Sequence, residues 1–140
     1  MQPYQATCVT IEGRGILIEG EPGTGKSSLA LALLDRGAEL VGDDSLLIEA
    51  RDGRLWAHPH PATRGLLEIR NLGLLPQPVR EDAAIALVLR LDEAAPRFID
   101  AAESCSVLGV LLPRIRLWPG GAILHLKAEL ALMRYGLAAR

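Results

Sequence analysis

A glycine-rich segment at residues 20–27 is the feature that most constrains the fold of this 140-residue chain. An apolar stretch at residues 16–18 precedes it, and leucines and alanines at helical spacing follow it. Glycines at this spacing let backbone N–H groups approach an anion closely, and the dipole of the following helix favours negative charge at the same place. The segment therefore predicts a strand, a phosphate-binding loop (P-loop) and a helix, in that order.

The loop has the residues needed to bind the phosphates of a nucleotide such as ATP. Lys26 is expected to reach the β- and γ-phosphate oxygens, and the Ser27 hydroxyl is expected to ligate Mg²⁺. A chance glycine-rich turn is the alternative, but every fixed position of the motif is filled. The residues expected to contact the nucleotide are Gly20, Glu21, Pro22, Gly23, Thr24, Gly25, Lys26, Ser27 and Ser28.

The composition predicts one folded domain over residues 1–140. Hydrophobic residues make up 49% and aromatic residues 4%, so the core must be largely aliphatic. A net charge of −2 gives no general attraction to nucleic acid or to an anionic membrane, and no apolar run is long enough to span a bilayer. The start of the chain lacks signal-peptide features and Cys8 and Cys105 lack CxxC spacing, so we expect reduced thiols in a cytoplasmic protein.

Periodicity and turn residues predict a mixed α/β fold with two helices packed on a sheet. Strands are expected at residues 7–11, 15–19, 39–41, 46–49, 55–57, 85–89, 107–112 and 114–117, the last two separated at Pro113. Residues 92–104 are expected to be an exposed excursion, and the prolines at 59, 61, 76 and 78 indicate a loop-rich middle. One helix follows the P-loop and ends before Gly37. The second lies near the C-terminus with an apolar stripe formed by Ile123, Leu126, Leu130, Met133 and Leu137.

Two acidic pairs could supply the carboxylate that a P-loop enzyme needs near Mg²⁺. Asp43 and Asp44 end the strand that follows the P-loop helix, whereas Asp92 and Glu93 follow the apolar run that ends at Leu91. Adjacent strand ends would bring the first pair toward Lys26, and nothing in the sequence places the second pair. An exposed acidic turn is the alternative for either pair, and it is favoured for Asp92 and Glu93.

The three histidines are expected to be structural. His58 and His60 could form a metal pair, but no cysteine or acidic cluster accompanies them, so a surface loop is the better interpretation. His125 falls within the predicted C-terminal helix.

The order of the motifs resembles the C-terminal catalytic domain of HPr kinase/phosphorylase, in its short form without an N-terminal domain. The most specific stretches are an RGxxLVxDD-like sequence at residues 36–44 and an EIRxLGL-like sequence at residues 68–74. The resemblance implies a fold similar to that of phosphoenolpyruvate carboxykinase. It also implies that ATP or pyrophosphate is used to phosphorylate a serine of the phosphocarrier protein HPr, reversibly, in the control of carbon or nitrogen metabolism. A homo-oligomer is the usual assembly in this family.

The resemblance also implies roles for individual residues. Lys26 would hold phosphate, and Ser27, Asp43 and Glu68 would be the metal ligands. The general base that takes the serine proton falls in the pair formed by Asp43 and Asp44, with Asp44 the first choice. Arg70 would stabilise the charge of the transferred phosphoryl group, as the chemistry requires.

This chain departs from the family pattern at several positions. Gln5 stands where the family has a histidine, Pro22 where serine is usual, and Ser28 where an acid is usual. Asn71 replaces a glycine, Gly121 replaces an arginine, and residues 91–107 are too few for the family's flexible catalytic loop. Nucleotide binding should survive these changes. Three hypotheses therefore remain: a serine kinase acting on HPr, a nucleotide sensor without catalysis, and an ATPase that uses Asp92 and Glu93.

Overall fold

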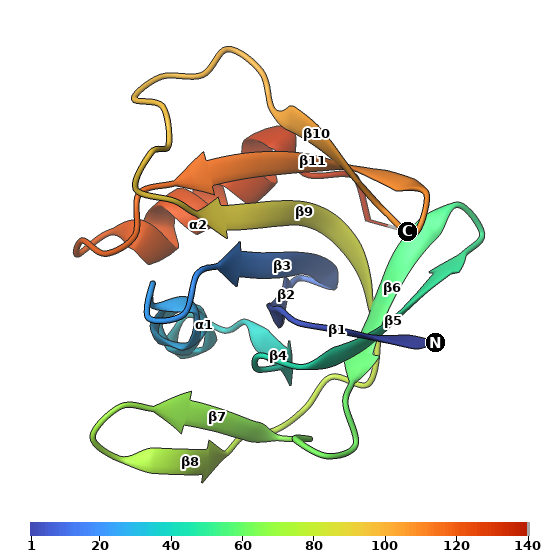
Figure 1. The fold of residues 1–140 in the computed structure, drawn as a ribbon, viewed down its shortest axis with the longest axis vertical. Helices are drawn as coiled ribbons and strands as arrows, with labels where there is room; N and C mark the ends of the chain where they lie inside the picture. Colours follow the sequence, from blue (N-terminus) through green and yellow to red (C-terminus); the bar gives the residue numbers. More distant parts are fainter. Residues whose placement is uncertain (140) are drawn as a thin grey trace.

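The computed structural model describes residues 1–139, which form a strongly curved sheet with two helices packed on one of its faces (Figure 1). The elements are β1 (Gln2–Tyr4), β2 (Thr7–Ile11), β3 (Arg14–Gly20), α1 (Lys26–Asp35), β4 (Glu39–Gly42), β5 (Leu46–Arg51), β6 (Arg54–Pro59), β7 (Leu66–Ile69), β8 (Gly73–Pro76), β9 (Ala83–Leu91), β10 (Glu103–Val107), β11 (Val110–Leu117) and α2 (Leu124–Tyr135). The expected mixed α/β class is confirmed. Within the same residues, no helix combines the length and apolar character needed to cross a membrane.

The sheet curves because β9 changes partners along its length. The main order is β1-β5-β6-β9-β3-β2-β4, with β10 and β11 attached beside β9. The start of β9 pairs with β6 at Ala83 and Ala84, whereas its end pairs with β11 from Val88 to Leu91. On its other side β9 runs parallel to β3, which places Leu91 opposite Gly20. The carboxyl ends of these two central strands therefore lie together at the glycine-rich loop (Figure 1).

A bulge in β9 divides its apolar side chains between two cores. The register with β3 shifts at Ala86, so Ala86 and Leu87 both face the core under the helices. Ile85 and Val88 face a second core, which the curved sheet encloses on its other side. Burial on both faces explains why this strand reads as a continuous apolar run.

The predicted apolar stripe of the C-terminal helix is wrong. Three of its members are exposed, namely Ile123 at 52%, Leu130 at 59% and Met133 at 73%. The buried face consists instead of Leu124, Ala128, Ala131 and Leu132. This face includes two alanines, whose small side chains let the helix approach the sheet closely but contribute little to a hydropathy pattern.

Several strand boundaries also differ from the prediction. The last hairpin turns at Leu108 and Gly109, both with positive φ, and not at Pro113. Pro113 lies inside β11, where it is tolerated because pairing with β9 begins only at Arg114. β10 occupies the end of the predicted excursion, and the β7–β8 hairpin lies in the middle segment predicted to be rich in loops. No element is predicted where β1 lies.

The predictions for the cysteines and for His125 are confirmed, and the prediction for His58 is wrong. Cys8 is buried, Cys105 is partly buried, and both thiols are free. His58 is not in a surface loop, because it lies in β6 with its Nε2 2.7 Å from the carboxylate of Glu49 on β5. His125 lies in α2 as expected.

Candidate active site

The glycine-rich loop joins β3 to α1 as the sequence predicts. A Cβ atom on Gly20 would lie 2.6 Å from Thr24 Oγ1 and 3.2 Å from the Leu91 carbonyl, so only glycine fits between the loop and β9. Gly23 and Gly25 have φ angles of 82° and 96°, which disfavour any side chain. The Thr24 hydroxyl and N–H both bond to the Glu21 carbonyl, at 2.8 and 3.2 Å, and close the loop on itself.

Lys26 begins α1 and lies over this loop. Its Nζ donates to the carbonyl of Gly20 at 2.8 Å and to that of Glu21 at 3.3 Å. The side chain borders two cavities, which also share Pro22 and Asp44. The ammonium group is therefore placed where anionic oxygens entering either cavity would meet it.

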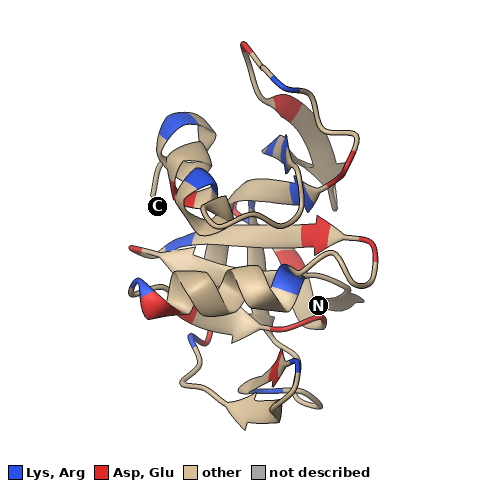
Figure 2. Cartoon of the chain, turned by 90° about the vertical axis from the view of Figure 1, so that its left-hand side faces the viewer, with Lys and Arg blue, Asp and Glu red and all other residues tan. Residues whose placement is uncertain are grey.

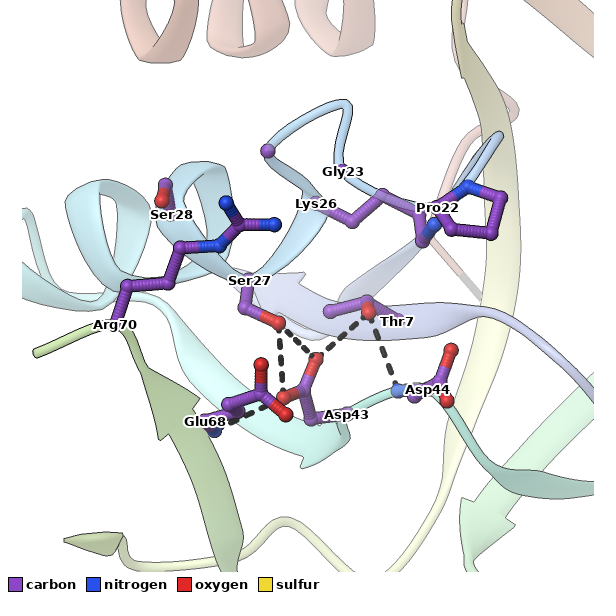
Figure 3. A pocket seen from close by; sticks show the side chains of 11 residues that line it. Thr7, Pro22, Gly23, Lys26, Ser27, Ser28, Asp43, Asp44, Glu68 and Arg70 are labelled. Carbon is purple, nitrogen blue, oxygen red and sulfur yellow. Dashed lines mark hydrogen bonds between the residues drawn. The ribbon is translucent and has the colours of Figure 1, made fainter. Parts of the chain in front are cut away.

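Asp43 is the most fully bonded carboxylate of the site (Figure 3). It is 7% exposed and follows the last residue of β4. Ser27 Oγ lies 2.7 and 2.9 Å from its two oxygens, Thr7 Oγ1 donates to Oδ1 at 2.8 Å, and the Glu68 N–H donates to Oδ2 at 3.0 Å. These bonds fix the carboxylate against the start of α1, beside the residue expected to ligate Mg²⁺.

Asp44 is exposed and is held differently from its neighbour. Its φ of 64° is in the left-handed region, and its N–H donates to Thr7 Oγ1 at 3.2 Å. Its carboxylate borders both cavities, and Oδ1 lies 3.5 Å from the amide nitrogen of Gln5. The Asp43 carboxylate is bonded to Ser27 of α1, whereas Asp44 is exposed at the edge of the two cavities.

Glu68 and Arg70 reach the site from the β7–β8 hairpin, which lies beyond α1 and β4 (Figure 1). Arg70 extends over the glycine-rich loop, with an Nη2 atom 3.7 Å from the position of a Cβ on Gly23. The hairpin turns at Asn71 with a φ of 73°, a conformation that asparagine tolerates. The replacement of the family's glycine at this position is thereby accommodated.

The cavity bordered by these residues, which we term the loop cavity, has a volume of about 170 Å³. It is lined by Thr7, Pro22, Gly23, Gly25, Lys26, Ser27, Ser28, Asp43, Asp44, Glu68 and Arg70. Acidic and basic side chains are mixed within it, as they are over the whole chain in Figure 2. This mixture can hold both a polyphosphate and a divalent cation.

The fit to Mg²⁺ can be tested on the side chains themselves. No group of three or more acidic, histidine or cysteine side chains converges as a ready metal site among the described residues. Mg²⁺ generally uses one or two protein oxygens together with waters and substrate phosphates, so Ser27, Asp43 and Glu68 fit a site completed by a nucleotide. The residues present suit a metal that arrives with its nucleotide.

A second cavity of about 510 Å³, which we term the side cavity, also borders Lys26. At the wall of this cavity the Tyr4 hydroxyl donates to the Glu19 carboxylate. Burial raises the pKa of Tyr4, and the bond to Glu19 raises this pKa further. Arg90 also lines it and lies 3.4 Å from Glu21 Oε1. Sequence reasoning missed Tyr4 and Arg90.

Asp92 and Glu93 do not line the loop cavity. Asp92 accepts the N–H of Ala94 at 2.8 Å and pairs with Arg116 at 3.4 Å. The Ala94 N–H first, and then Arg116, lower the pKa of this carboxyl group. Asp92 therefore caps a turn at the end of β9, although the strand itself ends beside the loop.

Thr7 is a third residue that sequence reasoning missed. Its side chain is buried, yet it connects Asp43 and Asp44 through the two bonds described above. The available signal was a polar residue opening an otherwise apolar strand. That signal is weak, because threonine is common in strands for its shape alone.

A strand, a glycine-rich loop and a helix that direct a lysine, a serine and paired aspartates into one cavity define a P-loop kinase fold. The family model for the HPr Serine kinase C-terminal domain matches residues 2–117, and the chain belongs to this family.

Individual relatives agree with this assignment. An HPr kinase/phosphorylase of Streptococcus thermophilus is 38% identical over 122 residues, which cover 78% of this chain and 40% of that protein. One from Streptococcus gordonii is 33% identical over 120 residues, covering 76% of this chain and 39% of that protein. The structure of the Hpr(Ser) kinase/phosphatase from Coxiella burnetii superposes with a TM-score of 0.84 at 26% identity and covers 95% of both chains. The chain thus spans about two fifths of the length of these curated relatives, and nearly all of the Coxiella chain.

Proposed function

We propose that this protein is a Mg²⁺- and ATP-dependent kinase that phosphorylates a serine hydroxyl of an HPr-like phosphocarrier protein. The observation that carries the proposal is the position of Asp44, whose exposed carboxylate borders both the loop cavity and the side cavity. The loop cavity is the donor side, because Gly23, Gly25, Ser27 and Arg70 line this cavity and not the side cavity. The side cavity is the acceptor side.

The proposed reaction assigns one task to each group. The loop N–H groups and Lys26 bind the phosphates, and Mg²⁺ neutralises charge on the β- and γ-oxygens when it is bound. Ser27, Asp43 and Glu68 would hold that metal, with the Ser27 hydroxyl oriented by its hydrogen bonds to Asp43. Asp44 accepts the proton of the serine hydroxyl as the serine oxygen attacks the γ-phosphorus. The bond from the γ-phosphorus to the bridging oxygen breaks, and ADP leaves with the electron pair.

Arg70 stabilises the negative charge on the transferred group from the opposite wall of the cavity. In the reverse direction inorganic phosphate would attack the phosphorus of the phosphoserine, and the bond from that phosphorus to the serine oxygen would break. Asp44 would give its proton to the departing serine oxygen, and the products would be pyrophosphate and free serine. We place this reaction in the cytoplasm, as a regulator of the phosphotransferase system, and expect a homo-oligomer.

The test is incubation with labelled ATP, Mg²⁺ and an HPr protein. Acid-stable phosphoserine should form, and Asp44→Asn should lower the rate by about 10²–10⁴-fold, because general-base catalysis typically contributes that much. An HPr variant with alanine in place of the target serine is the control. Transfer that persists in Asp44→Asn would contradict the assignment of the base.

A second candidate function is a nucleotide sensor that binds ATP without transferring phosphate. The observation that favours it is Gln5, whose amide lies 3.5 Å from Asp44 where the family has a histidine. An amide cannot titrate and so cannot adjust the proton affinity of the base. Tight ATP binding with no transfer to any HPr homologue would select this candidate.

A further inference from the structure

We propose that Thr7 is a positioning residue that couples the metal-binding half of the site to its general base, an inference that rests on the proposed function. Its Oγ1 donates to Asp43 Oδ1 at 2.8 Å and accepts from the Asp44 N–H at 3.2 Å (Figure 3). The side chain is fully buried. One hydroxyl therefore contacts two consecutive acidic residues that have different proposed tasks.

The topology of the sheet makes this contact possible. β2 pairs with β4 in antiparallel register, with Cys8 opposite Gly42. Thr7 precedes Cys8, and Asp43 follows Gly42, so the antiparallel arrangement brings Thr7 beside the two aspartates. The register shifts between Cys8 and Val9, and bulges of this kind are used to re-aim side chains near active sites.

The direction of both bonds is fixed by the donors available. A backbone N–H can only donate, so Asp44 must use an oxygen lone pair of Thr7. The single hydroxyl proton of Thr7 is then directed to the Asp43 carboxylate, which is an acceptor when ionised. The donor and acceptor cannot exchange roles in either bond, so the Thr7 hydroxyl proton has a single orientation, toward Asp43.

The two bonds have separate consequences. On one side, the Asp43 carboxylate is held in the rotamer in which it also bonds to Ser27 Oγ, at 2.7 Å. On the other side, the Asp44 backbone is held at a φ of 64°, a strained conformation for a residue with a side chain. Loss of the hydroxyl should therefore disturb the metal-binding group and the general base together.

The same strand supplies a matched control. Thr10 is also buried in β2, at 1% exposure, but its Oγ1 has no hydrogen-bond partner among the residues that the structure describes. Thr10→Val removes a buried hydroxyl that has no partner in the described part of the chain, and Thr7→Val removes one that bonds to both aspartates. The two variants make the same chemical change on the same strand.

The primary experiment measures ATP affinity by calorimetry with and without Mg²⁺. Thr7→Val should reduce the gain in affinity that Mg²⁺ gives by about tenfold, since a hydrogen bond to a charged group has this magnitude, and should leave Mg²⁺-free affinity nearly unchanged. Thr10→Val should retain the full gain. An equal gain in Thr7→Val and the wild type, or an equal loss in both valine variants, would overturn the inference.

A second pair of variants covers the case in which Thr7→Val does not fold. Thr7→Ala and Thr7→Ser both lose the methyl group, but only the first loses the hydroxyl, so serine should restore most of the Mg²⁺ response. If transfer to HPr is observed, Thr7→Ala should also lower kcat with little change in KM for HPr. Failure of transfer in the wild type would refute the kinase proposal and leave the Mg²⁺ measurement valid. Absence of Mg²⁺-dependent ATP binding in the wild type would refute both proposals.

Discussion

Replacing Asp43 by asparagine should destabilise the protein more than the same replacement at Asp44. The Asp43 carboxylate accepts donors from Ser27, Thr7 and the Glu68 N–H, and it is 7% exposed. An asparagine side chain has one acceptor oxygen and an NH₂ group. Either orientation of the amide leaves one of the surrounding donors without an acceptor.

The magnitude follows from that unmade bond. Leaving a buried donor unsatisfied costs about 1–3 kcal/mol. In a domain of this size each kcal/mol lowers Tm by about 3–5 °C, so Asp43→Asn should lower Tm by several degrees. Asp44 is exposed, its contact with Gln5 is long at 3.5 Å, and asparagine tolerates its φ of 64°. Asp44→Asn should therefore change the free energy of unfolding by about 0.5 kcal/mol or less.

Differential scanning calorimetry of the two variants without nucleotide measures this difference. Circular dichroism at low temperature is the control that both variants fold. A Tm for Asp43→Asn equal to that of the wild type would refute the hydrogen-bond reasoning. An equal loss in both variants would show that charge, and not the bonding of Asp43, determines stability at this position.

Two further predictions concern the glycine-rich loop and the thiols. Gly20→Ala should weaken ATP binding at least tenfold and lower Tm, because the new Cβ would lie 2.6 Å from Thr24 Oγ1. Equilibrium binding of a fluorescent ATP analogue would measure the affinity. An affinity equal to that of the wild type would contradict the close packing at Gly20. Burial raises the pKa of both thiols, and Cys8 is fully buried whereas Cys105 is partly exposed. At pH 8 an aromatic disulfide reagent should therefore modify Cys105 slowly and Cys8 only after denaturant is added, and rapid labelling of Cys8 in the native protein would contradict its burial.

The parts of the site that are local in sequence could be predicted from sequence. The glycine-rich loop, Lys26 and Ser27 lie within one strand-loop-helix unit, so their geometry follows from glycine spacing and helix initiation. Asp43 and Asp44 are predicted near Lys26 on the expectation that their strand ends next to the strand before the loop. That expectation is wrong, because β2 lies between β3 and β4. The structure confirms that these residues border one cavity.

The remaining parts depend on pairing between distant segments. Thr7 meets Asp43 only because β2 pairs with β4, and the two residues are 36 positions apart. Glu68 and Arg70 could be assigned to the site only through a family resemblance, since their hairpin was predicted as a loop. Short strands such as β7 and β8, with prolines nearby, carry too little periodicity to be distinguished from turns.

The strained backbone at Asp44 is consistent with a functional role for this residue. A left-handed conformation costs about 1 kcal/mol or more for a residue with a side chain, and a glycine at this position would remove that cost. Glycine is used at many other positive-φ positions of this chain, although Glu12, Asp52, Asn71 and Leu108 also have positive φ in turns. An aspartate here keeps the strain and places a carboxylate between two cavities. The Thr7 hydroxyl offsets part of the cost by accepting from the Asp44 N–H, and the same hydroxyl orients Asp43 by a second hydrogen bond.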